Sequence, residues 1–230
     1  MALPMLTEPV EELERAALGE LQAVVRQLDR AVEAVTRQDV ELAAEVLAVD
    51  GAADRQCRLI QERVLAALTS HRAPPDLQML ACLLHVLRGS RRIGSQCVHM
   101  AELVPATAPP PAESTALLEL IEGAAALSVS GVWLARAAFA ARDVELAHEV
   151  VRLDAELTRR SRVIFARALE LADADDLREW ALSLLLFGSY AERISDAAVD
   201  IAEQTVIVVH GLFRDVSEAD PSSREPAATR

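Results

Sequence analysis

Three acidic residues recur at a spacing of four near the end of the sequence, and they are the residues best placed to do chemistry. Glu192, Asp196 and Asp200 would stack on one face of a helix, with Glu203 slightly rotated from them. Carboxylates held this close repel one another unless positive charge lies over them. A hard cation with oxygen ligands supplies that charge, and so do water and neighbouring arginines. The stripe is therefore either a metal site or a solvated acidic face.

Composition favours a helical, acidic protein. The 230 residues are 52% hydrophobic but only 3% aromatic, a usage that suits helices better than sheets. A net charge of −13 argues against nucleic acid or an anionic membrane as a partner, because either requires a basic surface. No uncharged apolar run reaches the roughly 18 residues that a membrane span needs. The longest low-charge stretch, 123–135, is better interpreted as a buried helix.

The cysteines and the N-terminal residues indicate a cytoplasmic protein. Cys57, Cys82 and Cys97 are odd in number and form no Cys-x-x-Cys pair, which favours reduced, partly buried thiols. Residues 1–10 carry no basic residue before an apolar run, so we expect no signal peptide.

The sequence contains an internal duplication. Seven apolar positions at helical spacing within 13–35 recur 104 residues later, where all but Ser128 are apolar, and seven more within 42–67 recur at the same offset. The run Asp-Val-Glu-Leu-Ala occurs at both 39–43 and 143–147, where the aspartate can cap the helix that follows. Matches this numerous at one offset predict a repeated helical unit.

A cluster of prolines divides the two units. Four prolines fall between 105 and 111 and predict a stiff linker at 105–114, because no helix or strand tolerates that density. We therefore predict an all-α fold of two tandem three-helix bundles, at 8–104 and 115–214. The polar residues 215–230 are expected to form a disordered tail.

The third helices of the two units align through Arg92-Ile93 and Arg193-Ile194. The second of these helices carries Ala-Glu-Arg-Ile-Ser-Asp at 191–196 and Ala-Val-Asp-Ile-Ala-Glu at 198–203. These runs, in register within a duplicated unit, resemble the Leu-Glu-Arg-Ile-Gly-Asp and Ala-Val-Asn-Ile-Ala-Glu runs of the PhoU family. The resemblance covers residues from about 10 to 213 of this chain.

This resemblance implies a regulator rather than an enzyme. Members of the PhoU family are accessory regulators of bacterial phosphate uptake. The resemblance therefore implies a cytoplasmic protein that controls a phosphate transporter. It would act through contacts with the ATPase of that transporter and with a sensor histidine kinase.

The resemblance also implies multinuclear metal clusters, one in each repeat, held by acids of the second and third helices. In the first repeat Asp50 and Asp54 match the Asp-x-x-x-Asp motif of the family's second helix. Arg91 and Ser95, however, stand where the family has acids on the third helix. We therefore expect the first repeat to hold no metal and Arg91 to pair with Asp50 or Asp54.

The second repeat keeps more of the implied ligands. Asp154, Glu192 and Asp196 remain, while Thr158 replaces the fourth acid. Oxygen ligands favour a hard ion such as iron, Mn²⁺, Mg²⁺ or Ca²⁺. We therefore predict a smaller metal site at these three carboxylates.

Two other functions and a homodimer remain open from the sequence. A metal-free helical adaptor fits the missing ligands. A di-metal carboxylate enzyme would need two Glu-x-x-His motifs, and the chain has one, Glu145 with His148, whose counterpart in the first repeat is Ala44. Long bundles often form symmetric dimers, and the apolar run at 205–209 is a candidate contact, although it also suits the core of a single chain.

Overall fold

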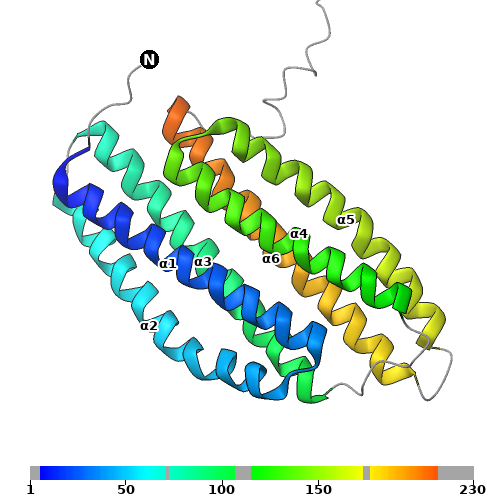
Figure 1. The fold of residues 1–230 in the computed structure, drawn as a ribbon. Helices are drawn as coiled ribbons and strands as arrows, with labels where there is room; N and C mark the ends of the chain where they lie inside the picture. The colour runs from blue at the N-terminus through cyan, green and yellow to red at the C-terminus, as the bar shows by residue number, and fades with distance from the viewer. Residues whose placement is uncertain (1–5, 71–72, 107–114, 173–176, 212–230) are drawn as a thin grey trace, which may run out of the picture.

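Six long helices make up the part of the chain that the structure describes, and Figure 1 shows how they are arranged. The computed structural model describes residues 6–70, 73–106, 115–172 and 177–211, and it contains no strand among them. The all-α fold of two three-helix repeats is confirmed. The helices are α1 Glu8–Arg37, α2 Val40–Ser70, α3 Pro74–Ala106, α4 Thr115–Ala141, α5 Val144–Ala172 and α6 Arg178–His210.

The two repeats pack side by side through four of these helices. Helix α3 packs against α6 and α1 packs against α4, so these four form the centre of the molecule. Helix α2 packs against α1 and α3 at one flank, and α5 packs against α4 and α6 at the other. The candidate acids of the second helices therefore lie on elements that each pack against the third helix of their own repeat.

The turns between the first and second helices of each repeat are equivalent. Asp39 and Asp143 each accept a hydrogen bond at Oδ1 from the backbone N–H three residues later, at 2.9 and 3.1 Å. The residues before them, Gln38 and Arg142, both adopt a left-handed backbone, with φ of 54° and 57°. Each aspartate thus caps the helix that follows, as the shared offset of 104 predicts.

The residue that caps the start of α1 bonds to another helix. Thr7 occupies the N-cap position, but its hydroxyl donates to Asp76 Oδ2 at 2.9 Å instead of serving its own helix. Its backbone N–H donates to Asp76 Oδ1 at 3.1 Å. This buried carboxylate therefore ties the start of α1 to the start of α3.

Helix α4 is the most apolar of the six. Leu118–Ala141 is long and apolar enough to cross a membrane by length and composition alone, a test that core helices of soluble proteins also pass. Here α4 packs against α1, α5 and α6, and it buries Ala124, Val132 and Phe139. Its environment matches the buried helix expected from the sequence.

The run proposed as a dimer contact lies mostly inside the chain. Thr205, Val206 and Ile207 are buried in the core, and Val208 packs against it. Helix α6 turns this face toward its neighbours in the same molecule, so the prediction of a contact with a second chain through these three residues is wrong. Residues 107–114 of the predicted linker and the predicted tail at 215–230 lie outside the described residues.

Candidate functional site

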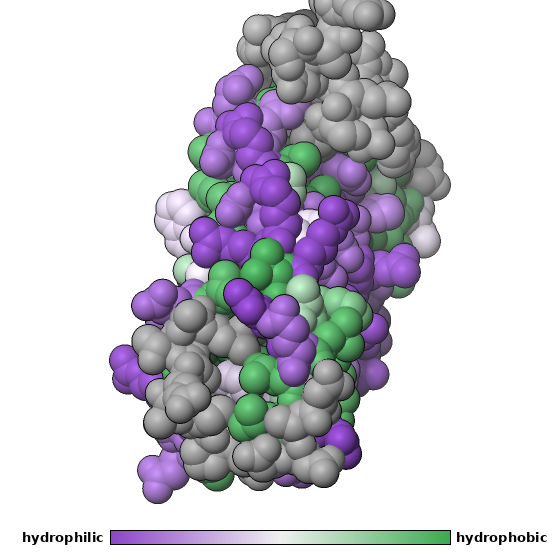
Figure 2. Space-filling view, turned by 90° about the vertical axis from the view of Figure 1, so that its right-hand side faces the viewer, coloured by the Kyte–Doolittle hydropathy of each residue, from purple (hydrophilic) through white to green (hydrophobic). Residues whose placement is uncertain are grey.

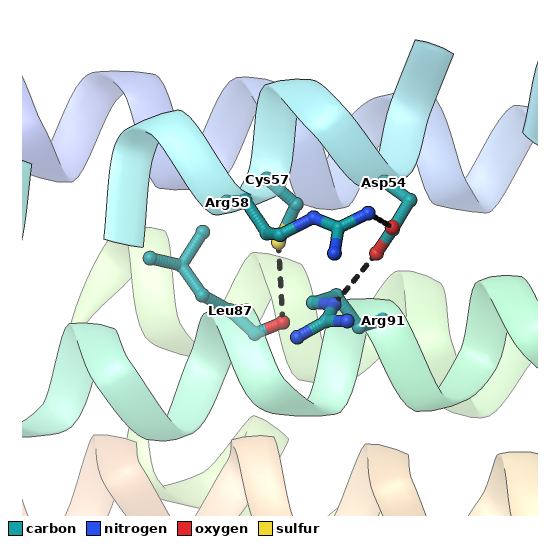
Figure 3. Close-up of polar contacts among 5 residues, drawn as sticks. All are labelled: Asp54, Cys57, Arg58, Leu87 and Arg91. Atoms are coloured by element: carbon teal, nitrogen blue, oxygen red, sulfur yellow. Dashed lines mark hydrogen bonds and ion pairs between the residues drawn. The ribbon is translucent and has the colours of Figure 1, made fainter. Parts of the chain in front are cut away.

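In the first repeat, arginines neutralise the aspartate of the candidate site. Asp54 on α2 accepts a hydrogen bond at Oδ1 from Arg91 Nε on α3, at 2.8 Å. Arg58, one turn along α2, pairs with Oδ2 of the same carboxylate (Figure 3). Each oxygen of Asp54 therefore already faces a guanidinium, and the expected pairing with Arg91 is present.

A polar crevice surrounds this ion pair. It has a volume of about 230 Å³ and lies between α1, α2 and α3. Asp50 lines it, as do buried Glu20 and Gln27. Burial raises the pKa of Glu20. Because Arg91 and Ser95 occupy the positions of acids, this donor set fits internal ion pairing and does not fit a metal cluster.

The cysteine thiols are buried and resist ionisation. Cys57 Sγ donates to the backbone carbonyl of Leu87 at 3.4 Å. Burial raises the pKa of Cys57 to about 12. The charges of Glu20 and Asp54 raise it further by smaller amounts, and the charge of Arg91 lowers it. Burial likewise raises the pKa of Cys82 to about 11 and that of Cys97 to about 12. All three cysteines are free and buried, as the sequence indicated.

In the second repeat, the charge of one predicted metal ligand acts on another. The pKa of Asp196 on α6 is raised, first by burial and then by the charge of Asp154 on α5. Arg92 lowers it and Asp200 raises it. Asp196 as a whole is exposed to solvent, but its carboxyl group is partly shielded from water by the surrounding protein. This partial burial is the largest cause of the raised pKa.

The third predicted ligand lies in a different setting. Glu192 lines an open groove between α5 and α6. Within the described ranges, no group of three or more His, Cys, Asp or Glu side chains is arranged to hold a metal ion. The metal site at Asp154, Glu192 and Asp196 stays a prediction, and no functional step is derived from a metal.

The sequence did not reveal that Arg92 forms an ion pair between the two repeats. Arg92 on α3 pairs with Asp200 on α6, a residue of the acidic stripe. A second such bridge joins Arg142 to Glu14 at 2.5 Å, and both side chains are only 14% exposed. These partners lie more than 100 positions apart, so no local spacing could reveal them. Arg92 of the first repeat therefore neutralises part of the acidic stripe of the second repeat.

The fold defines the class to which this chain belongs: proteins built from a duplicated three-helix unit. A family model described as "PhoU domain" matches residues 20–104 and again 122–205. The chain belongs to the PhoU family.

Its relatives cover nearly the whole chain. A protein of Deinococcus radiodurans named "Phosphate-specific transport system accessory protein PhoU homolog" is 28% identical over 200 residues, which are 85% of this chain and 92% of that protein. A protein of Xylella fastidiosa strain Temecula1 with the same name is 26% identical over 197 residues, 84% of this chain and 80% of that one.

Solved structures share the fold. The phosphate transport system regulatory protein PhoU from Streptococcus pneumoniae superposes with a TM-score of 0.81 at 20% identity, covering 90% of this chain and 97% of that one. PhoU from Pseudomonas aeruginosa gives 0.79 at 24% identity, covering 89% and 98%. At these identities the likeness concerns the architecture alone.

Proposed function

We propose that this chain is an accessory regulator of bacterial phosphate uptake. The observation that carries the proposal is the match of the PhoU domain to both repeats, together with relatives named as accessory proteins of the phosphate-specific transport system. The regulator acts in the cytoplasm by binding other proteins, and it performs no catalytic step. Its partners are the ATPase of a phosphate transporter and a sensor histidine kinase.

The geometry of the first repeat favours a metal-independent mode of action there. Arg91 and Arg58 neutralise Asp54 from within the chain, so this crevice needs no added cation to be stable. A hard cation, whether iron, Mn²⁺, Mg²⁺ or Ca²⁺, remains a separate prediction for the second repeat. The ion pairs of the first repeat therefore support a regulator that works there as a metal-free adaptor.

A deletion strain tests the regulatory role. In the bacterium that encodes this chain, we expect loss of the gene to switch on a phosphate-starvation reporter when phosphate is plentiful, and a plasmid copy to switch it off again. Purified chain should also bind the transporter ATPase or the kinase in a direct binding assay. If the reporter stays off in the deletion strain and neither protein binds, the proposal is wrong.

We also propose that the chain works as a homodimer. The surface first considered for this contact, at 205–209, is largely intramolecular.

A further inference from the structure

The polar crevice of the first repeat contains two acidic side chains that no cation of the described chain neutralises. It lies between α1, α2 and α3, away from the side of the molecule that Figure 2 shows, where hydrophilic and hydrophobic side chains are mixed. Glu20 and Asp50 line it, and neither forms a hydrogen bond or an ion pair with the residues that the structure describes. Asp54 differs from them, because Arg58 and Arg91 already face its two oxygens. Two carboxyl groups of the crevice therefore remain available to a ligand.

A buried glutamine also indicates a ligand in the polar crevice. Gln27 on α1 lines it and is only 7% exposed, yet its Nε2 has no hydrogen-bond partner among the described residues. The Oε1 of the same amide lies 3.7 Å from the position of a Cβ added at Gly94, so the side chain rests against α3. Burying a polar group costs free energy unless it is hydrogen-bonded. A half-turn of the amide, whose two ends have nearly the same shape, presents an acceptor in place of Nε2.

The fold does not require these two polar side chains. Ala124 and Gly131 occupy the positions of Glu20 and Gln27 in the second repeat, at the offset of 104, and both are buried. The second repeat thus forms the same three-helix packing with small residues where the first repeat buries a carboxyl group and an amide. Polar groups kept inside a fold at a cost to its stability are typical of a binding site.

The two available carboxyl groups lie at opposite ends of the polar crevice. After burial, the charge of Glu20 is the next largest cause that raises the pKa of Cys57, so Glu20 lies at the level of Cys57 on α2. Asp50 precedes Cys57 by seven residues on that helix, a rise of about 10 Å. Burial and, to a smaller extent, the charge of Asp50 raise the pKa of Cys97 on α3. The neutralised Asp54 lies between the two levels.

Small and apolar residues lie between these two ends. Val24 on α1, Ala53 on α2 and Gly94 on α3 line the polar crevice. Its volume of about 230 Å³ is that of about seven water molecules at about 30 Å³ each. The crevice therefore has room for a short hydrocarbon chain with a positive charge at each end.

We propose that the polar crevice binds an aliphatic diamine of four or five carbons. One ammonium group donates hydrogen bonds to Glu20, and the other donates to Asp50 and Gln27. An extended four-carbon diamine separates its nitrogens by about 6 Å, and a charge-assisted hydrogen bond of about 2.8 Å at each end extends this reach to about 12 Å. Asp54 keeps its arginines, so the crevice is stable with or without the ligand.

A diamine fits the charges of the polar crevice better than a metal ion or a single ammonium group does. A metal ion needs several oxygen ligands that converge on one point at about 2.0–2.6 Å, whereas Glu20 and Asp50 lie at separate levels. Arg91 also repels a compact divalent charge at the middle of the crevice. A single ammonium group, as on a lysine side chain, pairs with one carboxylate and leaves the other without a cation.

Calorimetric titration of the full chain with 1,4-diaminobutane tests the site at physiological ionic strength. The control ligand is n-butylamine, which has the same carbon chain and one ammonium group. We expect the diamine to bind at one site per chain and at least about tenfold more tightly than n-butylamine, because it gains a second charge-assisted hydrogen bond. The side-chain amide resonances of Gln27 should shift during the titration. Equal affinities for the two ligands would overturn the proposal.

Substitutions at the two ends assign the ligand to the polar crevice. Glu20→Gln and Asp50→Asn should each weaken diamine binding about tenfold, to the level of n-butylamine. Glu62→Gln is the control, because Glu62 is an exposed acid on α2 that does not line the crevice, and it should change the affinity by less than about twofold. Circular dichroism should show the same helical content for all three variants. If Glu62→Gln weakens binding as much as the other two, the diamine responds only to the net charge and the proposal is wrong.

Two further ligands identify the kind of cation that the polar crevice accepts. N-acetyl-lysine amide presents the ammonium group of a protein side chain, and Mg²⁺ is a hard inorganic cation. We expect each to bind at least about tenfold more weakly than 1,4-diaminobutane, because neither reaches both carboxylates. If either binds as tightly as the diamine, the crevice accepts a lysine of another protein or a metal ion, and the diamine is the wrong ligand. The phosphate-starvation reporter tests the regulatory role separately, so failure of one proposal leaves the other standing.

Discussion

Ile201 on α6 packs directly over the backbone of α3 at Gly89. A Cβ added at Gly89 would lie 2.8 Å from Cγ1 and 2.9 Å from Cδ1 of Ile201. Ile201 is fully buried, so its side chain has little room to move away. The two repeats therefore meet at a glycine that lets their third helices approach closely.

Gly89→Ala should destabilise the protein, even though alanine is the better helix former. Overpacking costs about 1–3 kcal/mol, and improved helix propensity recovers about 1 kcal/mol or less of it. We expect a lower free energy of unfolding in urea. Gly19→Ala is the control, because nothing lies within 4 Å of a Cβ at Gly19, and it should raise the stability by about 0.5–1 kcal/mol. Equal effects of the two changes would show that the contact with Ile201 is unimportant.

The helical architecture was predictable because it depends on local patterns. The apolar spacing and the repeated run that begins at Asp39 and Asp143 specify helices and their caps through contacts three or four residues apart. The pairing of Arg91 with an aspartate of α2 was also predictable, because Arg91 takes the place of a family acid while Asp50 and Asp54 are retained. The sequence left both aspartates open as partners, and the structure pairs Arg91 with Asp54.

The contacts between repeats were not predictable from the sequence. Arg92 reaches Asp200 only because α3 packs on α6, and that packing depends on the tertiary arrangement. For the same reason, the apolar run that contains Val206 gave no sign of which neighbour would cover it. Within the first repeat, the hydroxyl of Thr7 bonds to Asp76, 69 positions away, a contact that no local pattern indicates.

The three cysteines should be unreactive while the protein is folded. With pKa values of about 11 to 12, roughly one thiol in a thousand or fewer is ionised at pH 8, and the thiolate is the reactive form. We expect no reaction with a disulfide reagent at pH 8 on the timescale of free cysteine. In guanidinium chloride all three thiols should react. Rapid labelling of any one of them in the folded chain would contradict the burial observed here.

Asp196 should make the protein less stable at neutral pH than in mild acid. Because its pKa is raised in the folded state, the native protein binds this proton more tightly than the unfolded chain does. Its contribution to stability therefore falls as pH rises from the unfolded value near 3.8 through the folded pKa. Asp196→Asn should raise the free energy of unfolding at pH 7 by at most about 0.5 kcal/mol, given solvent screening.

The pH dependence shows whether Asp196→Asn stabilises the protein by removing a charge or through other contacts of the amide. The advantage of Asp196→Asn should shrink toward zero as the pH is lowered below the unfolded pKa, where both states of the parent chain are protonated. Asp154→Asn should lower the pKa of Asp196, because it removes a charge that raises it. Urea titrations at several pH values and side-chain NMR measure the two effects. A pH-independent difference would contradict the assignment.

Removing Arg92 should make the acidic stripe a better cation site. Arg92 pairs with Asp200 and lowers the pKa of Asp196, so it supplies positive charge that a bound ion would otherwise provide. We expect Arg92→Ala to bind Mn²⁺ or Mg²⁺ about tenfold more tightly than the parent chain in calorimetric titrations, since hard cations favour uncompensated carboxylates. Arg92→Lys keeps the charge and should behave like the parent, while Asp154→Asn in the alanine background should remove the gain. Identical affinities for the parent and Arg92→Ala would mean that Asp154 and Asp196 form no cation site.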